Sequence, residues 1–97
     1  MNVQYHIELT IGMADGPRCI ARFFLGNDRE QALAIFRQLN GTRGVGEAAV
    51  ITLDFLETCN GLPLSIEMIG CTLDELGENC QTITRELFKY HALSPLS

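Results

Sequence analysis

Two local signals recur in this chain at one fixed spacing. The turn pair Asp15-Gly16 is followed 45 positions later by Asn60-Gly61, and the helix-start segment 27–30 is followed 45 positions later by the segment 72–75. A unit of about 45 residues is too small to bury its own apolar face, whereas two such units can share one sheet and one core. The spacing therefore predicts two tandem units, each made of a hairpin and a helix.

The predicted units cover residues 5–39 and 49–88 within a single domain that takes in residues 1–97. Their first strands support the repeat, because residues 7–11 match residues 51–55 in polarity at every position, at an offset of 44. A chain of this size has one core, since it buries only about 60 to 65% of the surface exposed when it is unfolded. A separate second domain is not expected.

Four segments carry the residue patterns of strands, namely 5–13, 18–25, 49–58 and 62–70. Apolar and polar residues alternate in the first and the third, which is typical of a strand with one face in water. The second has apolar residues at both odd and even positions, so we expect it at the centre of the sheet. In the fourth, the sequence predicts one set of side chains toward the helices, Leu64, Ile66 and Met68, and one set away from them, Ser65, Glu67 and Ile69.

The two hairpin loops are expected to differ in length by one residue. A three-residue loop from Asp15 to Pro17 would pair Ile11 with Ala21. A two-residue loop at Asn60-Gly61 would pair Phe55 with Ile66. Because a one-residue slip inverts every side chain of a strand, this difference would direct the apolar residues of both hairpins to one face.

Each hairpin is followed by a predicted amphipathic helix. Asn27 is the expected N-cap of the first helix, with Glu30 closing a capping box and Asn40-Gly41 ending the helix. Thr72 is the expected cap of the second. The residues predicted to face the sheet are Ala32, Ile35, Phe36 and Leu39 in the first helix, and Leu76, Cys80, Ile83 and Leu87 in the second.

These elements predict an α+β fold with the order ββαββα. With the strands numbered along the chain, the expected sheet is four-stranded and antiparallel in the order 1-2-4-3, with both helices on one face. This arrangement resembles the ferredoxin-like sandwich with its last strand moved to the front. The resemblance concerns the architecture alone, and folds of this kind carry many unrelated functions.

The charge and the absence of long apolar runs exclude several classes of partner. The net charge of −5 and the dispersed basic residues argue against nucleic acid, whose binding depends on clustered Lys and Arg. The first dozen residues lack the basic and unbroken apolar regions of a signal peptide, and no apolar run approaches the roughly 20 residues of a membrane span. We therefore expect a soluble, cytoplasmic protein.

The four cysteines, Cys19, Cys59, Cys71 and Cys80, have no C-x-x-C spacing, and only His6 and His91 are available as histidine co-ligands. Such spacing favours reduced thiols that act as small apolar side chains over a redox or metal site. Another candidate is the glycine-rich segment 41–47, which follows a helix and precedes a strand. A phosphate cradle needs the opposite order, so a connector is favoured over a loop that closes on a ligand.

The sheet face away from the helices is the predicted functional surface. Its candidate ligand or interface residues are Ile20, Arg22, Phe24, Leu56, Glu67 and Ile69. Exposed apolar side chains of this size favour a covering partner, first of all a second copy of the chain, otherwise another protein or a small ligand. Arg22 and Glu67 are expected side by side, either as a structural ion pair or as an anchor for a small anionic ligand.

Two classes of function follow from this surface. The first is a non-catalytic binding or assembly module that acts through the open face as a homodimer or an adaptor. The second is a small-molecule sensor or small enzyme with a pocket at the dimer interface, using His6, Glu8 and Asp54 together with the Arg22 and Glu67 pair. In the order 1-2-4-3, Glu8 and Asp54 would lie on opposite edges, roughly 14 Å apart, which disfavours joint catalysis within one chain. No residue is predicted to be catalytic, to ligate a metal or to bind a cofactor.

Overall fold

The computed structural model describes residues 2–44 and 49–90, with two helices and five strands. In chain order they are β1 (Val3–Met13), β2 (Gly16–Gly26), α1 (Arg29–Phe36), β3 (Thr42–Arg43), β4 (Ile51–Cys59), β5 (Leu62–Cys71) and α2 (Leu73–Tyr90). The predicted strands and helices all form. His91, and residues 45–47 of the predicted glycine-rich connector, lie outside the described residues.

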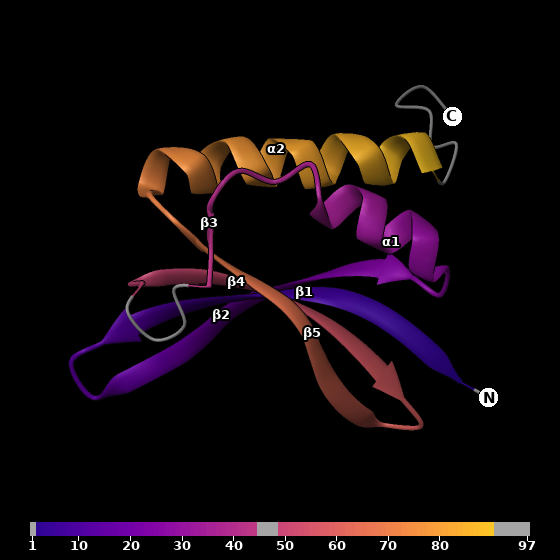
Figure 1. Ribbon diagram of the computed structural model, residues 1–97, viewed down its shortest axis with the longest axis horizontal. Helices are drawn as coiled ribbons and strands as arrows, with labels where there is room; N and C mark the ends of the chain where they lie inside the picture. The colour runs from indigo at the N-terminus through magenta and orange to yellow at the C-terminus, as the bar shows by residue number, and fades with distance from the viewer. Residues whose placement is uncertain (1, 45–48, 91–97) are drawn as a thin grey trace.

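The five strands form one antiparallel sheet in the order β2-β1-β4-β5-β3. Both helices lie over the same face of this twisted sheet, and the opposite face carries no helix among the described residues (Figure 1). The fold is therefore α+β, with a helix-covered face and an open face.

The predicted strand order 1-2-4-3 is wrong, because β1 and β4 are adjacent at the centre of the sheet. These two strands pair without interruption, from Val3 opposite Cys59 to Ile11 opposite Ile51. By contrast, the pairing with the hairpin partner shifts by one residue at two positions in β2 and at one position in β5. Such bulges twist a strand and suit the flanks of a sheet better than its centre.

The expectation of a four-stranded, ferredoxin-like sheet is not confirmed, because β3 adds a fifth strand. Thr42 and Arg43 pair with Gly70 and Ile69 at the outer edge of β5. A Cβ atom on Gly41 would lie 2.7 Å from the carbonyl oxygen of Gly70. Glycine is therefore required where the chain approaches β5 to form this pairing.

The first hairpin has a different register from the predicted one. Met13 pairs with Gly16, so the loop has two residues, and Ile11 pairs with Arg18 rather than with Ala21. The pairing then shifts at Ile20, which places Ala21 opposite Leu9 on the helix-covered face. The faces predicted for Arg22 and Phe24 are thus confirmed, but Cys19 lies opposite Thr10 on the open face and the predicted pairing partners are wrong.

The second hairpin has the predicted Asn60-Gly61 loop, in which both residues adopt positive φ angles of 52° and 84°. Beyond Leu56 the pairing shifts by one residue, so that Phe55 lies opposite Glu67 rather than Ile66. The predicted faces of Glu67 and Ile69 are therefore wrong. Both lie on the helix-covered side, where Ile69 is only 1% exposed.

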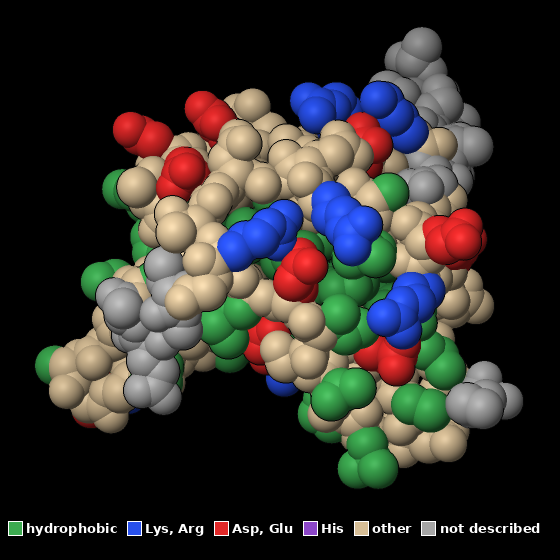
Figure 2. All heavy atoms as spheres, viewed as in Figure 1, with side chains coloured by type: hydrophobic (Ala, Val, Ile, Leu, Met, Phe, Trp, Pro, Cys, Tyr) green, Lys and Arg blue, Asp and Glu red, His purple; other side chains and the backbone are tan. Residues whose placement is uncertain are grey.

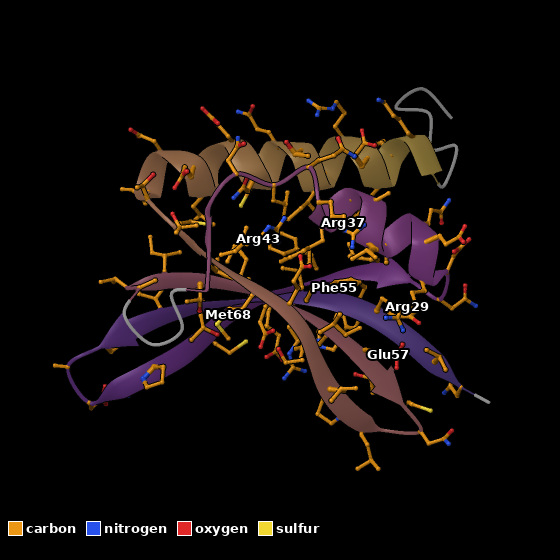
Figure 3. All side chains as sticks on the ribbon, in the orientation of Figure 1. Arg29, Arg37, Arg43, Phe55, Glu57 and Met68 are labelled. Atoms are coloured by element: carbon orange, nitrogen blue, oxygen red, sulfur yellow. The ribbon has the colours of Figure 1, made fainter. Side chains whose placement is uncertain are left out.

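Met68 is correspondingly on the open face, opposite Asp54. Figure 3 shows Met68 and Phe55 on opposite sides of the sheet. The physical reason is that Ile69 is buried in the core and the half-buried Ile66 packs against the same core. Residues three apart point to opposite faces of a regular strand, so a bulge between them is needed to bury both.

The core lies between the sheet and the two helices. Phe36 of α1 stacks on Phe55 of β4 with ring centroids 5.3 Å apart, and Ile83 of α2 is fully buried. The buried cluster contains Tyr5, Ile7, Leu9, Leu25, Ala32, Ile35, Phe36, Leu39, Leu53, Phe55, Ile69 and Ile83. The predicted apolar stripes of both helices contribute to it, with Leu76 and Leu87 packed at its margin.

The helix starts are local features that the sequence predicts in part. Thr72 and Glu75 form the expected reciprocal capping box of α2, since each backbone N–H donates to the other side chain. The cap of α1 is Asp28 rather than Asn27, and its carboxylate accepts from the backbone N–H of Gln31. Helix α1 also ends earlier than predicted, at Phe36.

Candidate functional site

Two rows of side chains cross the open face of the sheet. The apolar row runs over four strands as Phe24, His6, Leu56 and Ser65, and the charged row next to it runs as Arg22, Glu8, Asp54 and Met68. Each row takes one residue from each of β2, β1, β4 and β5. The site is therefore assembled by strand pairing rather than by a loop.

In the apolar row, Phe24 is 64% exposed and its ring lies 6.0 Å from the imidazole of His6. His6 and Leu56 are buried beneath the neighbouring side chains. Ile20, at the bulge of the same edge strand, is 51% exposed. The structure thus presents Phe24 and Ile20 as exposed apolar side chains on β2, while Leu56 is nearly covered.

In the charged row, Arg22 Nε lies 2.8 Å from Glu8 Oε2, and His6 Nε2 lies 3.7 Å from the same oxygen. The predicted neighbour of Arg22 was Glu67, and that prediction is wrong because β1 and β4 separate β2 from β5 and the bulge in β5 turns Glu67 to the other face. Glu67 instead pairs with Arg43 of β3 on the helix-covered side. The predicted set of six candidates is therefore divided, with four on β2 and the open side of β4 and two on the other face.

Asp54 is the acidic residue of the charged row that has no ion pair among the described residues. The hydroxyl of Ser65 donates a hydrogen bond to Asp54 Oδ1 over 2.5 Å. Partial burial raises the pKa of the Asp54 carboxyl and the nearby charge of Glu8 adds to this rise, whereas the hydrogen bond from Ser65 opposes it. Asp54 is thus a partly desolvated carboxylate that faces away from the helices.

Glu8 and Asp54 lie directly opposite each other on adjacent strands. The predicted separation of roughly 14 Å is therefore wrong, since neighbouring strands are only about 4.8 Å apart. The adjacency depends on the central pairing of β1 with β4, which the expected strand order did not contain. Among the residues that the structure describes, however, no three His, Cys, Asp or Glu side chains are arranged to hold a metal ion.

A cavity of about 490 Å³ opens on the same face near the β1–β2 turn. Its lining includes Thr10 and Gly12 of β1, Thr52 and Asp54 of β4, and Met68 of β5. The other lining residues are Met13, Gly16, Pro17, Ala49 and Val50. The volume is within the range of small-molecule pockets. In Figure 2 the two hairpins project below the helices as separate lobes with a hollow between them.

The helix-covered side carries a second group of charges that the sequence pattern did not predict. Arg29, Arg37 and Arg43 gather on one side of the molecule (Figures 2 and 3). Two of them are paired with carboxylates, because Arg29 Nη1 lies 3.3 Å from Glu57 Oε2 and Arg43 contacts Glu67. Most of this positive charge is thereby neutralised, so the three arginines do not favour an anion-binding site.

Tyr5 belongs to the same group, since its hydroxyl donates to Glu57 Oε2 over 2.7 Å. This hydrogen bond, together with burial, raises the pKa of the Tyr5 phenol. The residue is therefore held in its protonated form as part of the structure. The four cysteines are all free thiols, of which Cys19 is exposed and the other three are half-buried.

No described helix combines the length and apolar character needed to cross a membrane. Comparisons with protein-family models, curated proteins and solved structures give no match for this chain. Its function must therefore be argued from the open face itself.

Proposed function

We propose that this protein is a small binding and assembly module that forms a homodimer through the open face of its sheet. The observation that carries the proposal is the exposed aromatic ring of Phe24, next to the exposed Ile20 on the same strand. Apolar side chains of this size are removed from water when a second copy packs on them, at about 1.5 to 3 kcal/mol for each side chain that becomes fully buried.

A second copy of the chain suits this face for two further reasons. Arg22 lies beside Glu8, and a twofold axis would place the guanidinium of one copy against the carboxylate of the other, so the charged row is complementary to itself. The alternative of joining two sheets edge to edge is disfavoured, because the flanking strands β2 and β5 carry bulges. We place the protein in the cytoplasm in this proposal, because the reducing conditions there suit its four free thiols.

We also propose that the fold consists of two hairpin-and-helix units, 5–39 and 49–88, related by an internal pseudo-twofold axis. The register of β1 and β4 supports this, since Leu9 pairs with Leu53, its equivalent at the offset of 44. On either side of that pair, Ile7 lies opposite Phe55 and Ile11 opposite Ile51, as an axis through the pair requires.

The assembly is tested by light scattering on Phe24→Asp, with Leu73→Asp as the matched control. Leu73 is 74% exposed on α2, so the control makes the same chemical change on the opposite layer of the molecule. We expect a wild-type dimer, a monomeric Phe24→Asp and a dimeric Leu73→Asp. A twofold interface contains each residue twice, so the dimer should weaken at least about a hundredfold.

Circular dichroism should show that Phe24→Asp keeps its helices, because Phe24 lies outside the core. Phe24→Ser supplies a neutral second variant with the same expected dissociation. The proposal fails if wild-type protein is monomeric at high micromolar concentration, or if the control dissociates as readily as Phe24→Asp.

A second candidate function is that of a small-molecule sensor or small enzyme. It is favoured by one specific observation, the adjacency of Glu8 and Asp54 beside a cavity of suitable volume. The binding of a small ligand by monomeric protein would support this candidate in place of the first.

A further inference from the structure

We propose that the cavity near the β1–β2 turn binds a small primary ammonium compound with an apolar body, held by Asp54, Thr52 and Thr10. This inference names a ligand class for the sensing candidate and does not require the homodimer. The cavity shares Asp54 and Met68 with the charged row of the open face, but Phe24 is not among its lining residues. The variant Phe24→Asp therefore leaves the lining of the cavity unchanged and can separate the two proposals.

The charge of the lining points to a cation. Asp54 is the one charged side chain among the lining residues that the structure describes, and none of the described basic residues forms an ion pair with it. Arg22, the nearest basic residue in the charged row, is engaged with Glu8. An anionic ligand would meet a carboxylate and no cation in this cavity, whereas an ammonium group would supply the missing counter-charge.

The arrangement of acceptors points to a primary ammonium in particular. Thr10 and Thr52 lie opposite each other on β1 and β4, and Asp54 is two residues beyond Thr52 on the same face. Two hydroxyl oxygens and a carboxylate thus line one wall. A primary ammonium has three N–H donors, so it can donate to all three side chains, which a quaternary ammonium cannot do.

The remaining walls suit an apolar body. Met13, Val50, Met68 and Pro17 provide hydrocarbon and thioether surface around the acceptor wall. Methionine side chains adapt readily to the shape of a ligand. An alkyl or phenyl group attached to the ammonium would fill this volume, which exceeds what a simple inorganic cation requires.

The test is an NMR titration of the ¹⁵N-labelled full chain at neutral pH with three probes. The probes are phenethylammonium, its quaternary trimethyl derivative and 3-phenylpropionate, which share an apolar body and differ in the head group. We expect saturable shifts of the amide signals of Thr10, Val50 and Thr52 with phenethylammonium, weaker binding of the quaternary compound and no binding of the carboxylate.

Asp54→Asn should weaken phenethylammonium binding at least about tenfold, because it removes a charge-assisted hydrogen bond. Asp74→Asn, which removes one negative charge from the exposed first turn of α2, is the matched control and should leave the affinity unchanged. Thr52→Val removes one acceptor without changing the charge. Thr52→Val should reduce the ratio of the affinity for the primary compound to the affinity for the quaternary compound. This variant replaces Asp54→Asn if Asp54→Asn does not fold.

The proposal is overturned if no probe binds at millimolar concentration, if 3-phenylpropionate binds as tightly as the amine, or if Asp54→Asn and Asp74→Asn behave alike. Repeating the titration on Phe24→Asp separates the two proposals. Amine binding that persists in this variant supports the cavity whatever the state of assembly, and binding that disappears with dissociation overturns a site built by one chain.

Discussion

The two faces of the sheet are built from the same strands and differ in what their side chains do. On the helix-covered face, the central strands contribute Ile7, Leu9, Leu53 and Phe55, all buried in one continuous cluster. On the open face, the residues between them are His6, Glu8, Thr52 and Asp54, which are polar; His6 is buried and the other three are only partly shielded. The pattern of alternation therefore separates a structural face from a face that is free to bind.

The comparison also shows why flanking strands decide the character of the open face. The central strands supply its carboxylates, Glu8 and Asp54, but its exposed apolar side chains, Phe24 and Ile20, come from β2. The cavity likewise depends on Met68 of β5 and on the turn that joins β1 to β2. The exposed apolar side chains and part of the cavity lining thus come from the parts of the sheet where strand pairing is irregular.

The largest expected effect distinguishes two neighbours on β5. Ile69→Asn should cost more than about 4 kcal/mol of unfolding free energy, because it puts an amide without a partner into the core. Met68→Asn changes a half-buried side chain on the open face and should cost less than about 1 kcal/mol. Urea unfolding measures both. Equal losses, or a larger loss for Met68→Asn, would mean that the faces of β5 are assigned the wrong way round.

Local patterns predicted most of the elements of this fold. The alternation in β1 and β4, the Asn60-Gly61 turn and the Thr72 capping box each depend on residues close together in the sequence, so their signals are readable there. The strand order depends on which strands pair without interruption, and no single segment carries that information. Apolar residues on both sides of 18–25 suggested a central strand, whereas the structure leaves two of them exposed at an edge.

The bulge in β5 accounts for the wrong faces predicted for Glu67, Met68 and Ile69. One signal for it was present in the sequence, since Ile66 and Ile69 are both large and apolar and lie three residues apart. A regular strand cannot bury both on one face. The positions of Phe24 and Arg22 were predictable from the alternation of β2, but the adjacency of Glu8 to Asp54 was not, because it follows from the strand order.

A smaller effect is expected from the charge that the open face holds. At neutral pH, Asp54→Asn should raise the unfolding free energy, because the partly buried site disfavours the ionised carboxylate and raises its pKa. The groups that act on it are Glu8 and His6 across β1 and Ser65 on β5, with Arg22 engaged by Glu8. Urea unfolding from pH 7 to pH 3 provides the measurement.

The sign follows from the direction of the pKa shift. The folded chain takes up the proton before the unfolded chain as the pH falls, so the penalty is fully present above the folded-state pKa. This penalty should disappear when the pH is below the ordinary aspartate pKa of about 3.9. The difference in unfolding free energy between Asp54→Asn and wild type should therefore decrease on acidification. A difference that increases would contradict the raised pKa of Asp54. Asp74→Asn should have the opposite sign at neutral pH, since a carboxylate in the first turn stabilises a helix.

The smallest expected effect concerns two thiols on opposite faces and leaves stability unchanged. Cys19 is exposed on β2 opposite Thr10, whereas Cys71 lies opposite Ile51, where its sulfur accepts a hydrogen bond from Asn79 over 3.4 Å. Burial raises the pKa of the Cys71 thiol and so lowers its thiolate fraction. In native protein, a thiol-reactive dye should modify Cys19 first.

Serine variants assign the kinetic phases of that reaction. Cys19→Ser should remove the fastest phase and Cys71→Ser should leave it intact, while all thiols should react at similar rates in urea, where the faces no longer exist. Loss of the fastest phase in Cys71→Ser would contradict the burial of that face. Because assembly through the open face would also cover part of β2, a slower reaction of Cys19 in wild-type protein than in Phe24→Asp would connect this measurement to the proposed dimer.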